Sequence, residues 1–298
     1  MKRSAVIAIA ASTVVVIGAA VLGTAALLGA NADPPMVNPA TAAPSTSPSP
    51  APSVVPAYTP LDGAAIAALP EALYSAVIPG LLPHRAAAIP EASMTTYRIS
   101  ADQPLYGADR VTPVARFAAK NFLVEDSVVV PVSFEGDWAL VLTPSRQSLP
   151  SKDPDAPAQT VGWMPAAALE KVQDLTFHVV VSIAEETVSI VDRSGKVSET
   201  FSAAVGAPGT PTPTGVVGYL QARYLDPAQN QEKYPIALTS LHSDAADEPY
   251  RGSDGGLIGM HYQADRQGAI SAGCVRLSAE AITAVNNLPL GTPIVLEP

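Results

Sequence analysis

The sequence predicts a mainly β protein of two modules, which follow an apolar N-terminal segment and a proline-rich linker. Short runs of β-branched and aromatic residues, bounded by Gly, Pro and Asp, recur from about residue 93 to the C-terminus. Helical spacing is weak by comparison, so we expect only one or two short helices. Proline makes up 30 of 298 residues, about twice its usual share, and much of the excess lies in one linker.

The N-terminal segment, 1–32, predicts export of the rest of the chain. Lys2 and Arg3 precede Ala5–Ala30, an uncharged stretch rich in Ala, Val, Ile and Leu. It is long enough to span a bilayer, and the two cations place the N-terminus on the cytoplasmic side. The alternative is a cleaved signal peptide, because residues 30–32 fit a small-x-small cleavage site. We expect an extracytoplasmic protein, either tethered to the cytoplasmic membrane by this one segment or secreted.

Residues 33–60 are almost entirely Pro, Ala, Ser, Thr and Val, a composition that forms an extended tether and no core. Residues 61–92 predict a short helical or irregular segment, which Pro70 interrupts. Residues 93–172 predict a small β domain with one long loop between 143 and 159. Its expected strands are Thr95–Ile99, Val111–Phe117, Ser127–Ser133, Trp138–Thr143 and Thr160–Met164.

Residues 173–298 predict a second β-rich domain. It begins with a meander of antiparallel strands over 176–205, followed by a restricted loop over 206–215 that we place beside the active site. Arg223 to Gly256 read as a long irregular lid, with His242 on its surface. Ser278 predicts the N-cap of a helix over about 279–287, with Ala281, Ile282, Val285 and Leu288 inward, before a final strand over 292–296.

Composition excludes several classes of function. A formal net charge of −10, with no basic cluster beyond the N-terminus, argues against a nucleic-acid partner. The single cysteine excludes an internal disulfide and a Cys-rich zinc site. We therefore expect neither a metal nor a cofactor.

That cysteine, Cys274, is the candidate nucleophile. A thiol attacks as the thiolate, and an imidazole such as that of His261 is the usual group that takes its proton. Gly273 permits a tight turn with bare backbone N–H groups for an oxyanion, and Arg276 can bind a carboxylate through paired hydrogen bonds. A lone cysteine is more often a small buried hydrophobe. A free thiol outside the cell, however, is an oxidation liability, which favours a chemical use.

The segment Ser271-Ala272-Gly273-Cys274-Val275-Arg276-Leu277, with His261 upstream, resembles the signature of L,D-transpeptidase (YkuD-type) catalytic domains. Residues 205–215 (VGAPGTPTPTG) resemble the Gly/Pro/Thr loop of that family, and residues 290–296 (LGTPIVL) resemble its closing strand. The resemblance covers about 175 to the C-terminus. Residues 93–172 are similar to a bacterial SH3-like barrel, a module that often binds the cell wall, or they are only a spacer.

The resemblance implies peptidoglycan stem peptides as substrates, cell-wall crosslinking as the activity and carbapenem β-lactams as covalent inhibitors. It implies Cys274 as nucleophile and His261 as general base. Gly273 and Cys274, with a possible contribution from Ala272, would supply the oxyanion hole. Arg276 would bind the donor carboxylate, and Ser271 and Tyr262 would also contact the substrate. Ser271 would in addition support the loop.

Two positions depart from the family pattern. Ala272 stands where the family commonly has His or Lys, and Tyr262 stands where it often has Gly or Ser. We therefore expect a backbone carbonyl to orient His261. Two other functions stay open: an L,D-carboxypeptidase that hydrolyses the same acyl-enzyme, and a non-catalytic wall-binding protein on the same fold.

Overall fold

The computed structural model describes residues 55–245 and 256–298, and Ser53–Pro298 form one compact unit. The predicted anchor or signal peptide and most of the linker lie outside the described residues. Within the described ranges, no helix has the length and apolarity needed to cross a membrane. The predicted boundary between 172 and 173 falls inside strand β8 (Glu170–Asp174), so the two modules follow each other without a linker.

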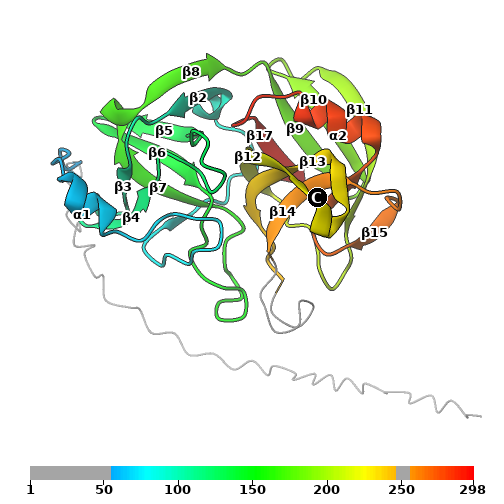
Figure 1. Cartoon of the computed structure of the whole chain (residues 1–298), viewed down its shortest axis with the longest axis horizontal. Coiled ribbons are helices and arrows are strands. Elements are labelled where there is room, and N and C mark those ends of the chain that lie inside the picture. The colour runs from blue at the N-terminus through cyan, green and yellow to red at the C-terminus, as the bar shows by residue number, and fades with distance from the viewer. Residues whose placement is uncertain (1–54, 246–255) are drawn as a thin grey trace, which may run out of the picture. The chain divides into compact units, whose positions relative to one another are not determined.

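The first module is an antiparallel sheet in the order β4-β3-β7-β6-β5, with β1 paired to β7 (Figure 1). A separate two-stranded ribbon pairs β2 with β8. The short helix α1 (Gly63–Ala67) and the 3-10 turn η1 (Glu91–Met94) precede the ribbon. The strands of the module are β1 (Leu82–Pro83), β2 (Thr95–Arg98), β3 (Gln103–Tyr106), β4 (Pro113–Phe117), β5 (Pro131–Glu135), β6 (Trp138–Thr143) and β7 (Thr160–Pro165).

Five of these strands lie where the residue pattern predicts them, namely β2, β4, β5, β6 and β7. The residue pattern does not predict strands β1, β3 and β8. Pro104 obscures the β pattern of β3, and the side chains of β8 are exposed and mostly polar. The predicted long loop is present between β6 and β7. The likeness of this module to an SH3-like barrel stays a prediction.

The second module is a sheet that closes on itself. Its strands run in the order β10-β9-β17-β12-β13-β14-β16-β11-β15, and an additional pairing of β10 with β11 completes the ring. A buried core of Val, Ile, Leu and Ala side chains joins this sheet to the last helix. The strands are β9 (Phe177–Ser182), β10 (Thr187–Asp192), β11 (Val197–Gly206), β12 (Val216–Asp226), β13 (Gln231–His242), β14 (Leu257–Tyr262), β15 (Gly268–Ser271), β16 (Val275–Leu277) and β17 (Pro293–Glu297).

The predicted helix is present as α2 (Ala279–Asn286). Ser278 caps it, because its hydroxyl accepts a hydrogen bond from the Ala281 N–H at 3.0 Å. Its inward side chains, including Ile282 and Val285, are buried in the core of the closed sheet. This helix holds strand β16 from the side opposite the thiol.

The predicted irregular lid is wrong over most of its described length. Residues 223–242 belong to the long hairpin of β12 and β13, whose register runs from Leu220↔Thr239 to Asp226↔Gln231. The charges and Pro235 obscured a strand that is mostly exposed or half-buried at its start, continuously buried afterwards and nowhere alternating. Residues 246–255, which were also assigned to the lid, lie outside the described part of the chain.

His242 is likewise not a surface residue. It ends β13 and is only 2% exposed. A ring nitrogen, Nε2, lies 2.7 Å from the carbonyl oxygen of Pro144 in the first module. Burial, together with the positive charge of Arg146, lowers the pKa of His242 to about 3. The imidazole is therefore a neutral structural contact between the two modules.

The two modules share a core. Tyr219 of β12 is 1% exposed and packs with Val130, Leu142 and Val161 of the first module. Next to it, Ser240 donates a hydrogen bond to Gln159 Oε1 at 2.6 Å. Strand β12 is thus fixed from both sides, by the closed sheet and by the first module.

Candidate active site

Cys274 lies in a tight turn between β15 and β16. Gly273, just before it, has a φ of +102°, a conformation that favours glycine. The Gly273 N–H donates to Ser271 Oγ at 3.2 Å, and the Ser271 hydroxyl donates in turn to the Cys274 carbonyl. Ser271 is 2% exposed, so its side chain supports the turn and is not placed to touch a substrate. This corrects its assignment as a substrate contact.

The sheet register brings three predicted residues to one face. Strands β14 and β16 are parallel, and His261 pairs with Arg276. Neighbouring residues in register share a face, as do residues two apart on a strand. Cys274, Arg276, His261 and Gly259 therefore share one face, which we call the thiol face. Met260 and Val275 point the other way, into the core.

The thiol is held by the backbone of β14. Cys274 Sγ accepts a hydrogen bond from the Gly259 N–H at 3.4 Å and lies 3.8 Å from the Leu257 carbonyl oxygen, to which it can donate. A Cβ on residue 259 would lie 3.9 Å from the sulfur and 3.3 Å from Ile236, so glycine leaves room beside the thiol. Burial raises the pKa of Cys274, while the Gly259 N–H and the charge of Arg276 oppose this.

A backbone carbonyl orients His261, as the sequence predicts. Its Nδ1 lies 3.1 Å from the Tyr262 carbonyl oxygen, so Nδ1 carries the proton and Nε2 keeps its lone pair. Burial lowers the pKa of His261; the hydrogen bond to Tyr262 opposes this shift and the charge of Arg276 adds to it. At neutral pH the structure therefore holds a thiol and a neutral imidazole rather than an ion pair.

The 206–215 loop is hydrogen-bonded to the turn that carries Cys274, so it lies beside the candidate site, as predicted. Ala207 N–H and Thr210 Oγ1 both donate to the Ser271 carbonyl, at 2.8 and 2.9 Å. Thr212 Oγ1 accepts from the Gly206 N–H and donates to the Gly273 carbonyl, both at 2.8 Å. The threonines of this loop are thus a second set of site residues, whose role sequence reasoning left unassigned.

The remaining predicted site residues are Arg276, Ala272 and Tyr262, and they differ in exposure and in the face on which they lie. Arg276 is half-buried on the thiol face and takes part in none of the ion pairs found within 55–245 and 256–298. Ala272 is exposed at the outside of the turn. Tyr262 follows His261 and points to the opposite face, where its ring lies 5.0 Å from that of Tyr234. The expectation that Tyr262 contacts substrate is therefore wrong for its side chain, and its carbonyl serves the site instead.

Tyr224 is a site residue that the sequence did not single out. It pairs with Ile236 across β12 and β13, and Ile236 contacts the position of Gly259, so Tyr224 lies on the thiol face. Burial raises the pKa of its phenol, and the charge of the Cys274 thiolate contributes to that shift. Its ring lies 6.0 Å from Phe122 of the first module. Residues 223–226 read as the start of a lid in sequence, so no strand register linked Tyr224 to the thiol.

The second module is thus a closed β-sheet that presents a thiol, an imidazole and a guanidinium on one face. Residues 176–296 match the YkuD family, the L,D-transpeptidase catalytic domain. The C-terminal part of this chain is therefore similar to the YkuD-type L,D-transpeptidase catalytic domain, as its motifs indicate. No curated protein matches the chain significantly.

Similar solved structures include L,D-transpeptidases. One from Mycobacterium smegmatis is 15% identical over 58% of this chain and 91% of that chain, with a TM-score of 0.34. L,D-transpeptidase 1 of Mycobacterium tuberculosis is 17% identical over 47% and 78%, with a TM-score of 0.30. An Enterococcus faecium L,D-transpeptidase mutant is 19% identical over 41% and 49%, with a TM-score of 0.28.

Proposed function

We propose that this protein is a peptidoglycan L,D-transpeptidase that forms cell-wall crosslinks by cysteine acyl transfer. The observation that carries the proposal is the thiol face itself. Cys274, His261 and Arg276 share one side of the sheet, and the catalytic turn is clamped by the 206–215 loop. An exported thiol with this much built around it is better explained by chemistry than by packing.

In the proposed reaction, His261 Nε2 takes the proton of the thiol, and Cys274 Sγ attacks the carbonyl between an L-centred and a D-residue of a donor stem peptide. The C–N bond then breaks, His261 returns the proton to the leaving amine, and a thioester remains. The amine of a second stem peptide attacks the thioester, loses a proton to His261 and releases the thiol. The product is an amide crosslink.

The Cys274 thiol and the His261 imidazole are both neutral before the reaction begins. Because burial raises the pKa of Cys274 and lowers that of His261, the proton moves only as the reaction begins. The S–H bond must turn from the Leu257 carbonyl toward the imidazole, while the Gly259 N–H stays in place to stabilise the developing thiolate. Arg276 would hold the donor carboxylate.

The oxyanion hole is also a proposal, formed by backbone N–H groups of the turn around Gly273, Cys274 and Ala272. Gly273 already donates to Ser271 Oγ in this structure, so its N–H would have to be shared with the oxyanion. The Cys274 N–H is the donor that the proposal needs most. Two well-placed donors of this kind lower a barrier by several kcal/mol.

We further propose that the protein acts outside the cytoplasmic membrane, anchored by segment 1–32 or secreted, and that carbapenems acylate Cys274. The support for export is the apolar segment after Lys2 and Arg3. The support for acylation is chemical: a strained β-lactam amide needs only a thiolate and an oxyanion hole, and its carboxylate can occupy the place beside Arg276.

Incubation of the full-length protein with a stem tetrapeptide, with and without an acceptor amine, tests the proposal by mass spectrometry of the products. A crosslinked dimer that depends on the acceptor indicates transfer. Loss of the terminal D-residue with water as sole acceptor indicates the carboxypeptidase instead. Cys274→Ala is the control and should yield neither product. If the wild-type protein also yields neither product and carries no acyl group, the non-catalytic wall-binding alternative is the better interpretation.

A further inference from the structure

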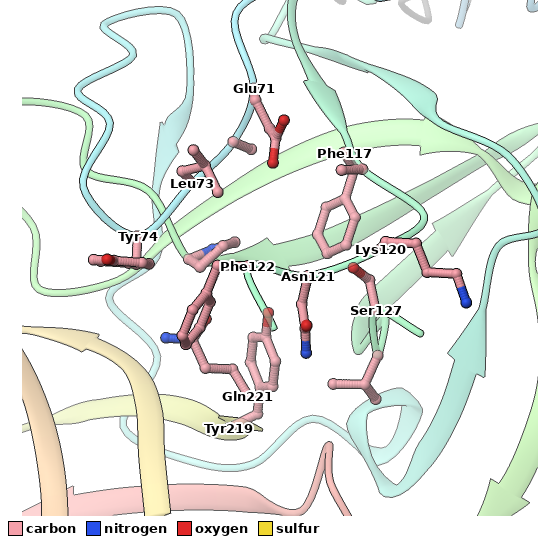
Figure 2. A pocket seen from close by; sticks show the side chains of 14 residues that line it. Glu71, Leu73, Tyr74, Phe117, Lys120, Asn121, Phe122, Ser127, Tyr219 and Gln221 are labelled. Carbon is pink, nitrogen blue, oxygen red and sulfur yellow. The ribbon is translucent and has the colours of Figure 1, made fainter. Parts of the chain in front are cut away.

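A pocket lies at the junction of the two modules, beside strand β12 (Figure 2). Its volume is about 40 Å³, which holds about three water-sized groups. Figure 2 shows Asn121 in the middle of the lining, between Phe122 and Ser127, with Tyr219 and Gln221 below them. Residues of the first module and of β12 together form its walls, so the pocket exists only where the modules meet.

Asn121 presents a donor that has no acceptor. Its Oδ1 accepts hydrogen bonds from the N–H groups of Leu123 and Glu125, at 2.8 and 3.1 Å. These two donors fix which end of the side-chain amide is oxygen. Nδ2 is therefore on the other side, where it is buried and has no hydrogen-bond partner among the described residues. Buried donors are nearly always satisfied, so this position calls for an acceptor from outside the chain.

The rest of the lining favours a neutral ligand with a small apolar end. Phe117 and Tyr219 are 5% and 1% exposed and contribute ring carbons. The charged members of the lining are already paired, Glu71 with Arg116 and Lys120 with Asp126. Three water-sized groups correspond to a methyl group and a carbonyl. A methyl-bearing amide fits this volume, and its oxygen would accept from Asn121 Nδ2.

Aromatic rings connect this pocket to the thiol face. Phe122 lines the pocket, and its ring lies 5.0 Å from that of Tyr74 and 6.0 Å from that of Tyr224. Tyr224 is three residues from Gln221 on β12, roughly 10 Å along a strand. A ligand anchored in the pocket can therefore run over Phe122 and Tyr224 toward Cys274.

We propose that this pocket is a subsite for a methyl-bearing amide of the polymeric substrate, and this rests on the proposed function. Two parts of a peptidoglycan strand have that chemistry: the acetamido group of an N-acetylated sugar and an alanine residue of a stem peptide. Each places a methyl group within two bonds of an amide carbonyl. The pocket holds one of them while the reacting amide lies at the thiol.

Binding can be measured without turnover in the full-length Cys274→Ala protein, labelled with ¹⁵N on Asn and Gln side-chain amides. The probes form two matched pairs: N-acetylglucosamine with glucosamine, and alanylalaninamide with glycylglycinamide. We expect the methyl-bearing member of one pair to shift the side-chain signals of Asn121 and Gln221 saturably. Its partner should bind at least about tenfold more weakly. The sugar pair identifies the glycan as the source, and the peptide pair identifies the stem.

Asn121→Asp tests the donor, because aspartate keeps the acceptor for Leu123 and Glu125 and removes Nδ2. We expect it to weaken binding at least about tenfold, read at Gln221. Asn287→Asp, at the exposed C-cap of the last helix, makes the same change of charge and should leave binding unaltered. The proposal is overturned if neither pair shifts these signals, or if both variants bind alike. Saturable binding in a protein that yields no crosslinked product would overturn only the proposed function.

Discussion

Thr212 links Gly206 to Gly273 in the turn that carries Cys274, and its substitution tests how this turn is held. Its hydroxyl accepts from the Gly206 N–H and donates to the Gly273 carbonyl, both at 2.8 Å, and the residue is 3% exposed. Thr212→Val keeps the branched shape but leaves two buried polar groups unpaired. At about 1–3 kcal/mol for each group, partly relieved by relaxation, we expect a loss of about 2–4 kcal/mol in unfolding free energy.

Thr210→Val is the matched control. Thr210 Oγ1 donates to the Ser271 carbonyl, but the Ala207 N–H donates to the same oxygen at 2.8 Å. That carbonyl stays satisfied in the variant, so the expected cost is below about 1 kcal/mol. Comparing the two variants thus separates two effects: the loss of the Thr212 bridge, which is its link between the Gly206 N–H and the Gly273 carbonyl, and the loss of a hydroxyl group in general.

Thermal unfolding and carbapenem acylation measure the two consequences. For a unit of this size each kcal/mol shifts Tm by about 2–4 °C, so Thr212→Val should lower Tm by roughly 4–16 °C and Thr210→Val by less than about 4 °C. Loss of the Gly273 anchor should also slow acylation of Cys274 by about tenfold to a hundredfold, because small misplacements of reacting groups are costly. Equal stability and equal acylation in the two variants would refute the bridge.

Further predictions concern the thiol face and the module junction. Intact-mass analysis should detect one carbapenem adduct, which Cys274→Ala should lack. His261→Ala should form this adduct about 10²–10⁴-fold more slowly. Arg276→Ala should lower the affinity for the carbapenem more than it lowers the maximal acylation rate. The pKa of His261 is lowered from 6.5 and that of Cys274 is raised from 9.0. The acylation rate should therefore rise with pH in two steps, one with a midpoint below 6.5 and one with a midpoint above 9. A single midpoint between these values would contradict a neutral thiol beside a neutral imidazole. The pKa of His242 is about 3 in the folded protein and 6.5 in the unfolded chain, so the unfolded chain binds more protons between these two pH values. The free energy of unfolding should therefore fall by up to about 1.4 kcal/mol per pH unit as the pH drops below 6.5. His242→Gln should flatten that slope in denaturant titrations at each pH, and an unchanged slope would place the lost stability elsewhere.

The residue pattern within a segment predicted the secondary structure of that segment. The β-branched runs gave most strands of both modules, and Ser278 with its inward apolar residues gave helix α2. The motif residues also identified the thiol, the imidazole and the guanidinium that share one face. Their common face, however, is a property of the parallel pairing of β14 with β16, in which His261 lies opposite Arg276. No spacing in the sequence specifies that register.

The wrong predictions share a physical cause. Contacts between residues that are far apart in the sequence decide whether a polar residue is buried or exposed and what its side chain contacts. His242 reads as a surface histidine, yet the Pro144 carbonyl from the preceding module satisfies its ring nitrogen and allows it to be buried. Tyr224 reads as part of a loop, because charges and turn residues surround a strand that only its partner strand stabilises. Ser271 reads as a possible substrate contact, but the turn around Gly273 consumes its hydroxyl.

Strand β12 makes the first module part of the catalytic unit. Tyr219 is buried against that module, Gln221 lines the junction pocket, and Tyr224 lies on the thiol face against Phe122. A displacement of the first module would therefore move the far wall of the active site through a single strand. We therefore predict that the first module forms one side of the proposed substrate-binding surface and is more than a spacer, because Tyr219 and Tyr224 of β12 both pack against it.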